Sequence, residues 1–175
     1  MSGKSIKVDM IPSVFTLGNL FFGFLAILWT MNGEYKMAAG FILFSVLMDS
    51  MDGKVARKLS VSSDFGKELD SLCDVVSFGV APAVLTYKVL LAAHMGFWGM
   101  LLAAAFAMCG AVRLARFNIL NITTHFLGVP ITFAGGFMAL LILFHKSLPW
   151  VIFPVALAVL AFLMVSTIKV PKLGK

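Results

Sequence analysis

Six long apolar segments recur along the chain, separated by short polar stretches. They run over Val14–Met31, Met37–Val55, Leu69–Leu91, Phe97–Phe117, Phe126–Phe144 and Trp150–Ile168. An α-helix rises about 1.5 Å per residue, so each segment is long enough, or nearly so, to cross about 30 Å of hydrocarbon. Polar and apolar residues do not alternate with a period of two, which favours helices over a β-barrel. The pattern therefore predicts an all-α, polytopic membrane protein with six transmembrane helices.

The same pattern divides the chain into three parts. Residues 14–170 are predicted to form a single six-helix membrane domain, and residues 171–175 a cytoplasmic tail. Residues 1–13 include Lys, Asp, Ile, Val and Met, a mixture that suits a short amphipathic segment lying in the membrane interface. A frayed terminus fits this composition equally well, so both interpretations stay open.

Composition agrees with a membrane protein, and the charges add an orientation. Hydrophobic residues make up 61% of the chain and charged residues 13%, about half the share usual in globular proteins. Most Lys and Arg residues gather on one side of the predicted membrane, namely Lys4, Lys7, Lys54, Arg57, Lys58, Lys67, Arg113, Arg116, Lys169, Lys172 and Lys175. The positive-inside rule makes that side the cytoplasm, so both termini are expected there, at the cell membrane. Because topology explains the net charge of +6, no nucleic-acid partner is expected.

Four aspartates interrupt the apolar pattern near the predicted cytoplasmic face. Asp49 and Asp52 lie three residues apart at the end of the second predicted helix, and Asp70 and Asp74 lie four apart at the start of the third. Both spacings place a pair on one helical face. Since the two helices are antiparallel neighbours joined by about a dozen residues, we expect the four carboxylates to converge.

A cluster of carboxylates in such a place indicates bound cations. One carboxylate within a transmembrane helix costs roughly 2.5–3.5 kcal/mol on insertion scales, so four together need a partner that offsets this cost. Divalent cations prefer carboxylate oxygens, and two of them would neutralise the cluster and clamp a phosphoryl group. A structural ion pair of Asp49 and Asp52 with Arg57 is the plainer alternative, but it would leave the other two aspartates unpaired.

The residues between the aspartates suit a phosphate-bearing substrate. Gly53 and Gly66 each remove a side chain where a phosphate could approach the backbone. Arg57 offers a planar fork that matches phosphate oxygens, and Ala56 keeps the helix narrow beside it. The aspartate segment is therefore expected to bind a phosphorylated or nucleotide substrate.

These residues match a known signature. The segment from Asp49 to Asp74 fits the pattern D-x2-D-G-x2-A-R-x8-G-x3-D-x3-D at all eight fixed positions, and on that ground the chain resembles the CDP-alcohol phosphotransferase family. The resemblance implies a six-helix membrane enzyme, usually a homodimer, that uses two magnesium or manganese ions. It also implies transfer of a phosphatidyl-type group from a CDP-linked lipid to an alcohol, with release of CMP.

The resemblance also implies roles for individual residues. Asp49, Asp52 and Asp70 resemble metal ligands, and Asp74 resembles the residue that ligates the second metal and deprotonates the acceptor. The positions that resemble CDP contacts are Gly53, Ala56 and Arg57. Thr16 and Asn19, in the first predicted helix, are further candidates for nucleotide contact, although each could equally bond a neighbouring helix.

Other segments bear on the acceptor alcohol. The stretches I-P-S-V-F-T-L-G-N-L-F-F-G from Ile11, F-G-K-E-L-D-S-L-C-D-V-V-S-F-G-V-A-P-A from Phe65 and G-A-V-R-L-A-R-F-N from Gly110 resemble small bacterial and archaeal members of the family. Those members form phosphatidylserine from CDP-diacylglycerol and L-serine. The stretch F-L-G-V-P-I-T-F-A-G from Phe126 is a weaker match, since a second proline or a small polar residue is expected near Ile131–Thr132.

Three residues near the end of the fourth predicted helix are candidates for binding serine. Arg113 and Arg116 lie three apart, and either could hold a carboxylate by a forked pair, with Asn118 as a further donor. Alternatively, the two arginines only satisfy the positive-inside rule and the helix dipole. The phosphate of glycerol 3-phosphate or of an inositol phosphate would also bind to cationic side chains here, so these acceptors stay open. An archaeal CDP-ether lipid stays open as the donor.

A divalent-cation transporter is a distant alternative, because intramembrane aspartates also mark ion pathways. Here the acids of the predicted helices all lie near one membrane face, and no path across the membrane is visible in the sequence.

Overall fold

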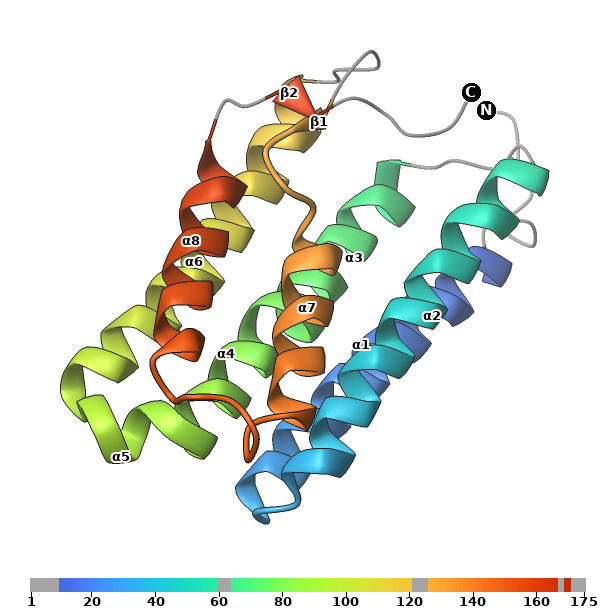
Figure 1. The fold of residues 1–175 in the computed structure, drawn as a ribbon. Helices are drawn as coiled ribbons and strands as arrows, with labels where there is room; N and C mark the ends of the chain where they lie inside the picture. The colour runs from blue at the N-terminus through green and yellow to red at the C-terminus, as the bar shows by residue number, and fades with distance from the viewer. Residues whose placement is uncertain (1–9, 60–63, 121–125, 167–168, 171–175) are drawn as a thin grey trace.

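The computed structural model describes residues 10–59, 64–120, 126–166 and 169–170. Nearly all of this part of the chain is helical (Figure 1). Five helices of 13 to 25 residues correspond to predicted segments: α1 (Met10–Met31), α2 (Tyr35–Leu59), α6 (Phe97–Leu120), α7 (Ile131–Leu143) and α8 (Ile152–Val165). The prediction of a helical protein is confirmed.

The third predicted segment forms a continuous helical run with two π-helical stretches in it. It consists of α3 (Asp64–Asp74), η1 (Val75–Val80), α4 (Ala81–Thr86), η2 (Tyr87–Leu91) and α5 (Ala92–Met95), and the two η elements are π-helical. A π turn carries more residues than an α turn and is often found beside functional sites. Here η1 begins directly after Asp74, so the winding changes next to the last aspartate of the cluster.

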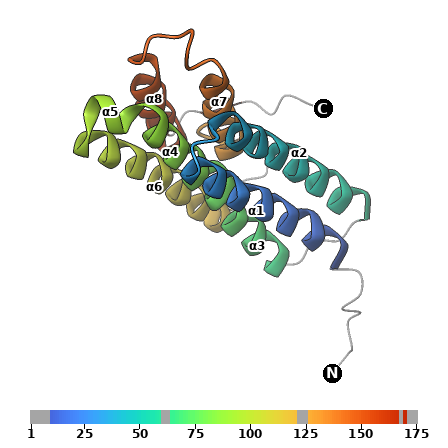
Figure 2. The same ribbon diagram turned by 90° about the horizontal axis from the view of Figure 1, so that it is seen from below.

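The helical run from α3 to α5 lies at the centre of the bundle. It contacts α1, α6 and α7, while α1 packs along α2 and α6 packs along α8 (Figures 1 and 2). Phe78 in η1 and Phe106 in α6 are fully buried, whereas large apolar side chains such as Phe24, Trp98 and Phe162 are exposed. An apolar exterior of this extent suits contact with lipid rather than with water.

Within the described ranges, three helical runs are long and apolar enough to cross a membrane by length and composition. They cover Val14–Met31, Phe65–Met95 and Phe97–Ile119, and α7 and α8 are shorter apolar helices. The structure therefore fits a multi-pass membrane protein. The crossing of the membrane by six helices stays a prediction.

One predicted helix begins later than the sequence pattern indicated. Instead of helix from Phe126, residues Phe126–Leu127 form the short strand β1, which pairs antiparallel with β2 (Lys169–Val170). Gly128 adopts a left-handed φ of 71°, and an added Cβ would lie 2.8 Å from the Leu163 carbonyl oxygen. Pro130 then precedes α7 with an extended ψ of 140°, which ends any helix running backward from Ile131.

Three helical elements meet at one point of α1, one turn below the aspartates. The hydroxyls of Ser45 in α2 and Ser77 in η1 both donate to the backbone carbonyl of Asn19, at 3.1 Å and 3.0 Å. Gly23 makes this approach possible, because a Cβ there would lie 2.8 Å from the Ser77 Cα. Hydrogen bonds and close packing therefore join α1, α2 and η1 at Asn19.

Candidate metal and substrate site

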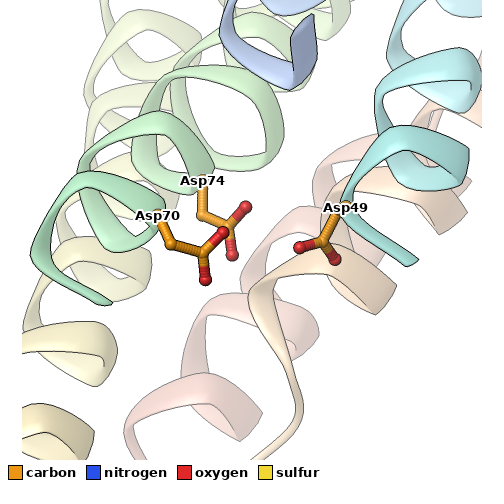
Figure 3. Close-up of side chains that lie close together, drawn as sticks. All are labelled: Asp49, Asp70 and Asp74. Carbon is orange, nitrogen blue, oxygen red and sulfur yellow. The ribbon is translucent and has the colours of Figure 1, made fainter. Parts of the chain in front are cut away.

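Three of the four signature aspartates come together between α2 and α3. Asp49 on α2 faces Asp70 and Asp74 on α3 (Figure 3). One carboxylate oxygen from each lies within 4.8 Å of the other two. Carboxylates this close repel one another strongly unless cations lie between them, because burial weakens the screening of their charges.

Asp52 lies beside this group rather than within it. Its side chain is buried, with 7% exposed, and one of its oxygens accepts a hydrogen bond from the Thr16 hydroxyl on α1. The charge of Asp52 still acts on Asp70, so the fourth carboxylate belongs to the same electrostatic environment. The role of Asp52 as a metal ligand stays a prediction.

Neutral donors from other helices hold three of the aspartates. The pairs are Thr16 with Asp52, Asn19 Nδ2 with Asp74 Oδ1 at 3.0 Å, and Thr132 Oγ1 with Asp49 Oδ2 at 3.2 Å. Each bond fixes a carboxylate through one oxygen, as is typical of side chains that orient metal ligands. The nature and spacing of these oxygens therefore fit hard divalent cations such as magnesium or manganese.

Thr132 is the residue of this site that sequence reasoning missed. It lies in the first turn of α7, 83 residues from Asp49 along the chain. The sequence analysis treated the stretch around Ile131–Thr132 as a departure from the family pattern and gave the hydroxyl of Thr132 no role. Its contact with Asp49 depends on the packing of α7 against α2, which the local pattern does not specify.

The structure describes only part of the predicted nucleotide site. Gly53 lies in α2 with open space where a Cβ would point, and Gly66 is half-buried in α3, one turn before Asp70. Ala56 and Arg57 lie within α2, but their side chains fall outside the part of the chain that the structure describes in detail. Nucleotide contact by these four residues stays a prediction.

Arg113 lies within electrostatic range of the carboxylate cluster. Its side chain is buried, with 8% exposed, and its charge interacts with that of Asp74. Its Nε atom has no hydrogen-bond partner among the residues that the structure describes. Of the three predicted acceptor-binding residues, Arg113 is therefore the one with an unused buried donor beside an aspartate.

The other two acceptor candidates are engaged in contacts between helices. Arg116 donates from Nη1 to the backbone carbonyl of Val165, at the end of α8, over 3.0 Å. Asn118 donates to the Ser71 hydroxyl at 3.0 Å and to Glu68 Oε1 at 3.3 Å, both on α3. These bonds tie the end of α6 to α8 and α3, and neither role was foreseen from the sequence.

Comparison with known sequences gives consistent relatives. A CDP-diacylglycerol–serine O-phosphatidyltransferase of Bacillus subtilis is 41% identical over 169 residues, which cover 96% of this chain and 93% of the relative. An enzyme of the same name from Methanocaldococcus jannaschii is 42% identical over 167 residues, covering 95% of this chain and 76% of the relative. An archaetidylserine synthase of Methanothermobacter thermautotrophicus is 36% identical over 167 residues, covering 93% and 70% respectively. Because the sequence model of the family also matches residues 9–165, this chain belongs to the CDP-alcohol phosphatidyltransferase family.

Proposed function

We propose that this protein is a transferase of phospholipid biosynthesis that joins a CDP-linked lipid to L-serine. The products are phosphatidylserine, or its archaeal ether analogue, and CMP. The observation that carries the proposal is the convergence of Asp49, Asp70 and Asp74 within 4.8 Å, in a chain similar over most of its length to proteins named for this reaction. The acidic cluster alone would not specify this reaction, and sequence similarity alone would not show that the carboxylates needed for the reaction come together in this chain.

The reaction is a single displacement at phosphorus. The hydroxyl oxygen of serine forms a bond to the phosphorus that carries the lipid, and the bond from that phosphorus to the CMP oxygen breaks. CMP leaves with the electron pair, and the hydroxyl proton passes to the Asp74 carboxylate, which Asn19 holds in place at 3.0 Å. An alcohol needs such a base because its own pKa is close to that of water.

The aspartates would hold the cations that this chemistry requires. We assign two divalent ions, magnesium or manganese, to Asp49, Asp52, Asp70 and Asp74. When bound, such ions supply positive charge that stabilises the phosphoryl group and the departing CMP. Thr132 and Thr16 keep Asp49 and Asp52 oriented for this task through their hydroxyl bonds.

The nucleotide is assigned to the ends of α2 and α3 that carry the signature. Gly53 leaves open space at the surface of α2, and Gly66 lies one turn before Asp70. Ala56 and Arg57 follow on α2, where a guanidinium can pair with phosphate oxygens. Thr16 borders the same region from α1.

We propose a cell-membrane enzyme of six crossing helices within residues 14–170, acting as a homodimer. Residues 1–13 would lie at the membrane interface, and residues 171–175 would form a cytoplasmic tail. The excess of Lys and Arg near the aspartate end of the bundle supports a site that faces the cytoplasm, with both termini on the same side. The exposed apolar side chains support a lipid environment for the bundle.

The test is metal-dependent CMP release by the purified protein. CDP-diacylglycerol and an ether-linked CDP-lipid are offered as donors, each with magnesium or manganese. Acceptors are L-serine, glycerol 3-phosphate and an inositol phosphate. We expect release only with serine and a metal; release with another acceptor instead would overturn the serine assignment and keep the reaction class. No release from either donor by folded protein would contradict the proposed function, and cation flux in vesicles would then support a transporter.

A further inference from the structure

Two buried polar atoms near the reaction centre lack a hydrogen-bond partner. Among the residues that the structure describes, they are Asn19 Oδ1, in a side chain with 0% exposed, and Arg113 Nε. Buried polar atoms are nearly always paired, and leaving one unpaired is costly. An unpaired acceptor and an unpaired donor in one site therefore indicate a ligand that supplies both partners.

One of the two side chains contacts Asp74, and the other lies near enough for its charge to act on Asp74. Asn19 donates from Nδ2 to Asp74 Oδ1 at 3.0 Å, and the Arg113 charge interacts with Asp74. The contact with Asp74 also fixes the amide orientation of Asn19, since the reversed amide would set its oxygen against a carboxylate oxygen. Asp74 is thus flanked by a free hydrogen-bond acceptor and by a free cationic donor.

This arrangement complements an α-amino acid that carries a hydroxyl. We propose that Arg113 binds the carboxylate of the acceptor and Asn19 Oδ1 binds its ammonium group, while Asp74 receives the hydroxyl. The inference rests on the proposed function and deepens it, because it names the groups that select serine. It assigns Asn19 to the acceptor instead of the nucleotide.

The same contacts disfavour the other acceptors. A sugar or glycerol phosphate has no ammonium group and would meet Asn19 Oδ1 only through a neutral hydroxyl, which makes a weaker hydrogen bond than a charged donor. Such a dianionic group is usually met by several donors, but Arg116 is occupied by the Val165 carbonyl and Asn118 by α3. Among the described residues, one unpaired guanidinium Nε and one unpaired amide oxygen suit a zwitterion better than a phosphate.

The experiment removes one charged group at a time from protein and from substrate. Acceptors are L-serine, 2-aminoethanol, which lacks the carboxylate, and 3-hydroxypropionate, which lacks the ammonium. Each is tested with wild-type protein and with Arg113→Gln and Asn19→Leu variants. The readout is kcat/KM for CMP release from CDP-diacylglycerol, or the inhibition constant against serine where turnover is slow. Arg116→Gln serves as the matched control, three residues along the same helix.

We expect each variant to lose one specific preference. Arg113→Gln should reduce the preference for serine over 2-aminoethanol by about ten- to a hundredfold and keep the preference over 3-hydroxypropionate. Asn19→Leu should reduce the preference for serine over 3-hydroxypropionate and keep the preference for serine over 2-aminoethanol. Arg116→Gln should change all three acceptors by the same factor. Because each preference is a ratio within one variant, a general loss of activity or of folded protein cancels.

Several outcomes would overturn the inference. Equal losses of kcat/KM for all three acceptors in Arg113→Gln or in Asn19→Leu would show that the substituted residue has only a structural role. A loss of preference in the control Arg116→Gln would show that the preference does not depend on Arg113 specifically. Should a variant be inactive with every acceptor, calorimetric binding of the three acceptors in the presence of CMP and magnesium replaces turnover and must show the same pattern. A wild-type protein that releases no CMP with serine contradicts the proposed function itself, which separates the two failures.

Discussion

Arg113 and Arg116 lie one turn apart on α6, yet their surroundings differ completely. Arg116 is half-buried and donates to the last turn of α8 through the Val165 carbonyl. Arg113 is more deeply buried, lies next to Asp74 and keeps an unpaired Nε. Chemically identical side chains thus make an interhelical contact in one case and keep an unpaired donor in the other, to which we assign acceptor binding.

The difference shows how hydrogen-bond satisfaction separates architecture from substrate binding. At the C-terminal end of α6, Arg116 and Asn118 donate to acceptors in neighbouring helices, and these bonds hold the helices together. One turn earlier on α6, Arg113 is buried and retains an unpaired atom, and so does the buried Asn19 on α1. Unpaired buried atoms lower the stability of the folded protein, and in our proposal the bound acceptor pairs with them and offsets that cost.

The largest effect is expected from removing Asp74, the proposed base, which accepts a hydrogen bond from Asn19. Asp74→Asn should lower kcat for CMP release by about a hundred- to ten-thousand-fold, because the hydroxyl proton loses its acceptor. The matched control is Glu68→Gln on the same helix, where the side chain is exposed. Retention of more than a tenth of wild-type kcat in Asp74→Asn, measured at saturating serine and metal, would refute the base assignment.

A middle-sized effect is expected at Thr132, which orients Asp49 from α7. Thr132→Val keeps the shape of the side chain but removes the donor, and it should weaken manganese binding by about ten- to a hundredfold. Thr132→Ser keeps the hydroxyl and should restore most of the affinity. Electron paramagnetic resonance of free manganese during a titration measures this directly. Equal affinities in the Val and Ser variants would show that the hydroxyl has no orienting role.

The smallest effect is expected at the satisfied end of α6. Arg116→Gln should lower the free energy of unfolding by about 1–3 kcal/mol, because it removes a charged donor from the Val165 carbonyl. The change is measured as a shift of the thermal midpoint in detergent, where Lys88→Gln on an exposed position provides a control. An unchanged midpoint with a raised KM for serine would reverse the comparison and return Arg116 to the acceptor site.

The sequence alone predicts the parts of this molecule that depend on local spacing. On one helix the aspartates are three residues apart, on the next they are four apart, and the connection between the helices is short. This spacing predicts that Asp49, Asp70 and Asp74 come together, as they do in the structure. The contact of Thr132 with Asp49 spans 83 residues and depends on how α7 packs against α2. No periodicity contains that information.

The contrast between Arg113 and Arg116 was equally out of reach. Their spacing places them on one helical face, which suggests a shared role. Their partners are set by where α8 ends and by how η1 packs below Asp74. The late start of α7 has a similar origin, because β1 pairs with a strand more than 40 residues away.

The shortness of α7 links the enzyme to the thickness of its own membrane. With 13 residues, α7 spans about 20 Å, whereas the hydrocarbon of a bilayer measures about 30 Å. A thick bilayer would have to thin around this helix, and the first turn of the helix carries the hydroxyl that bonds Asp49. Acyl-chain length would then act on the geometry of the carboxylates. The lipid that such an enzyme produces would then belong to the bilayer whose thickness affects the enzyme's own site.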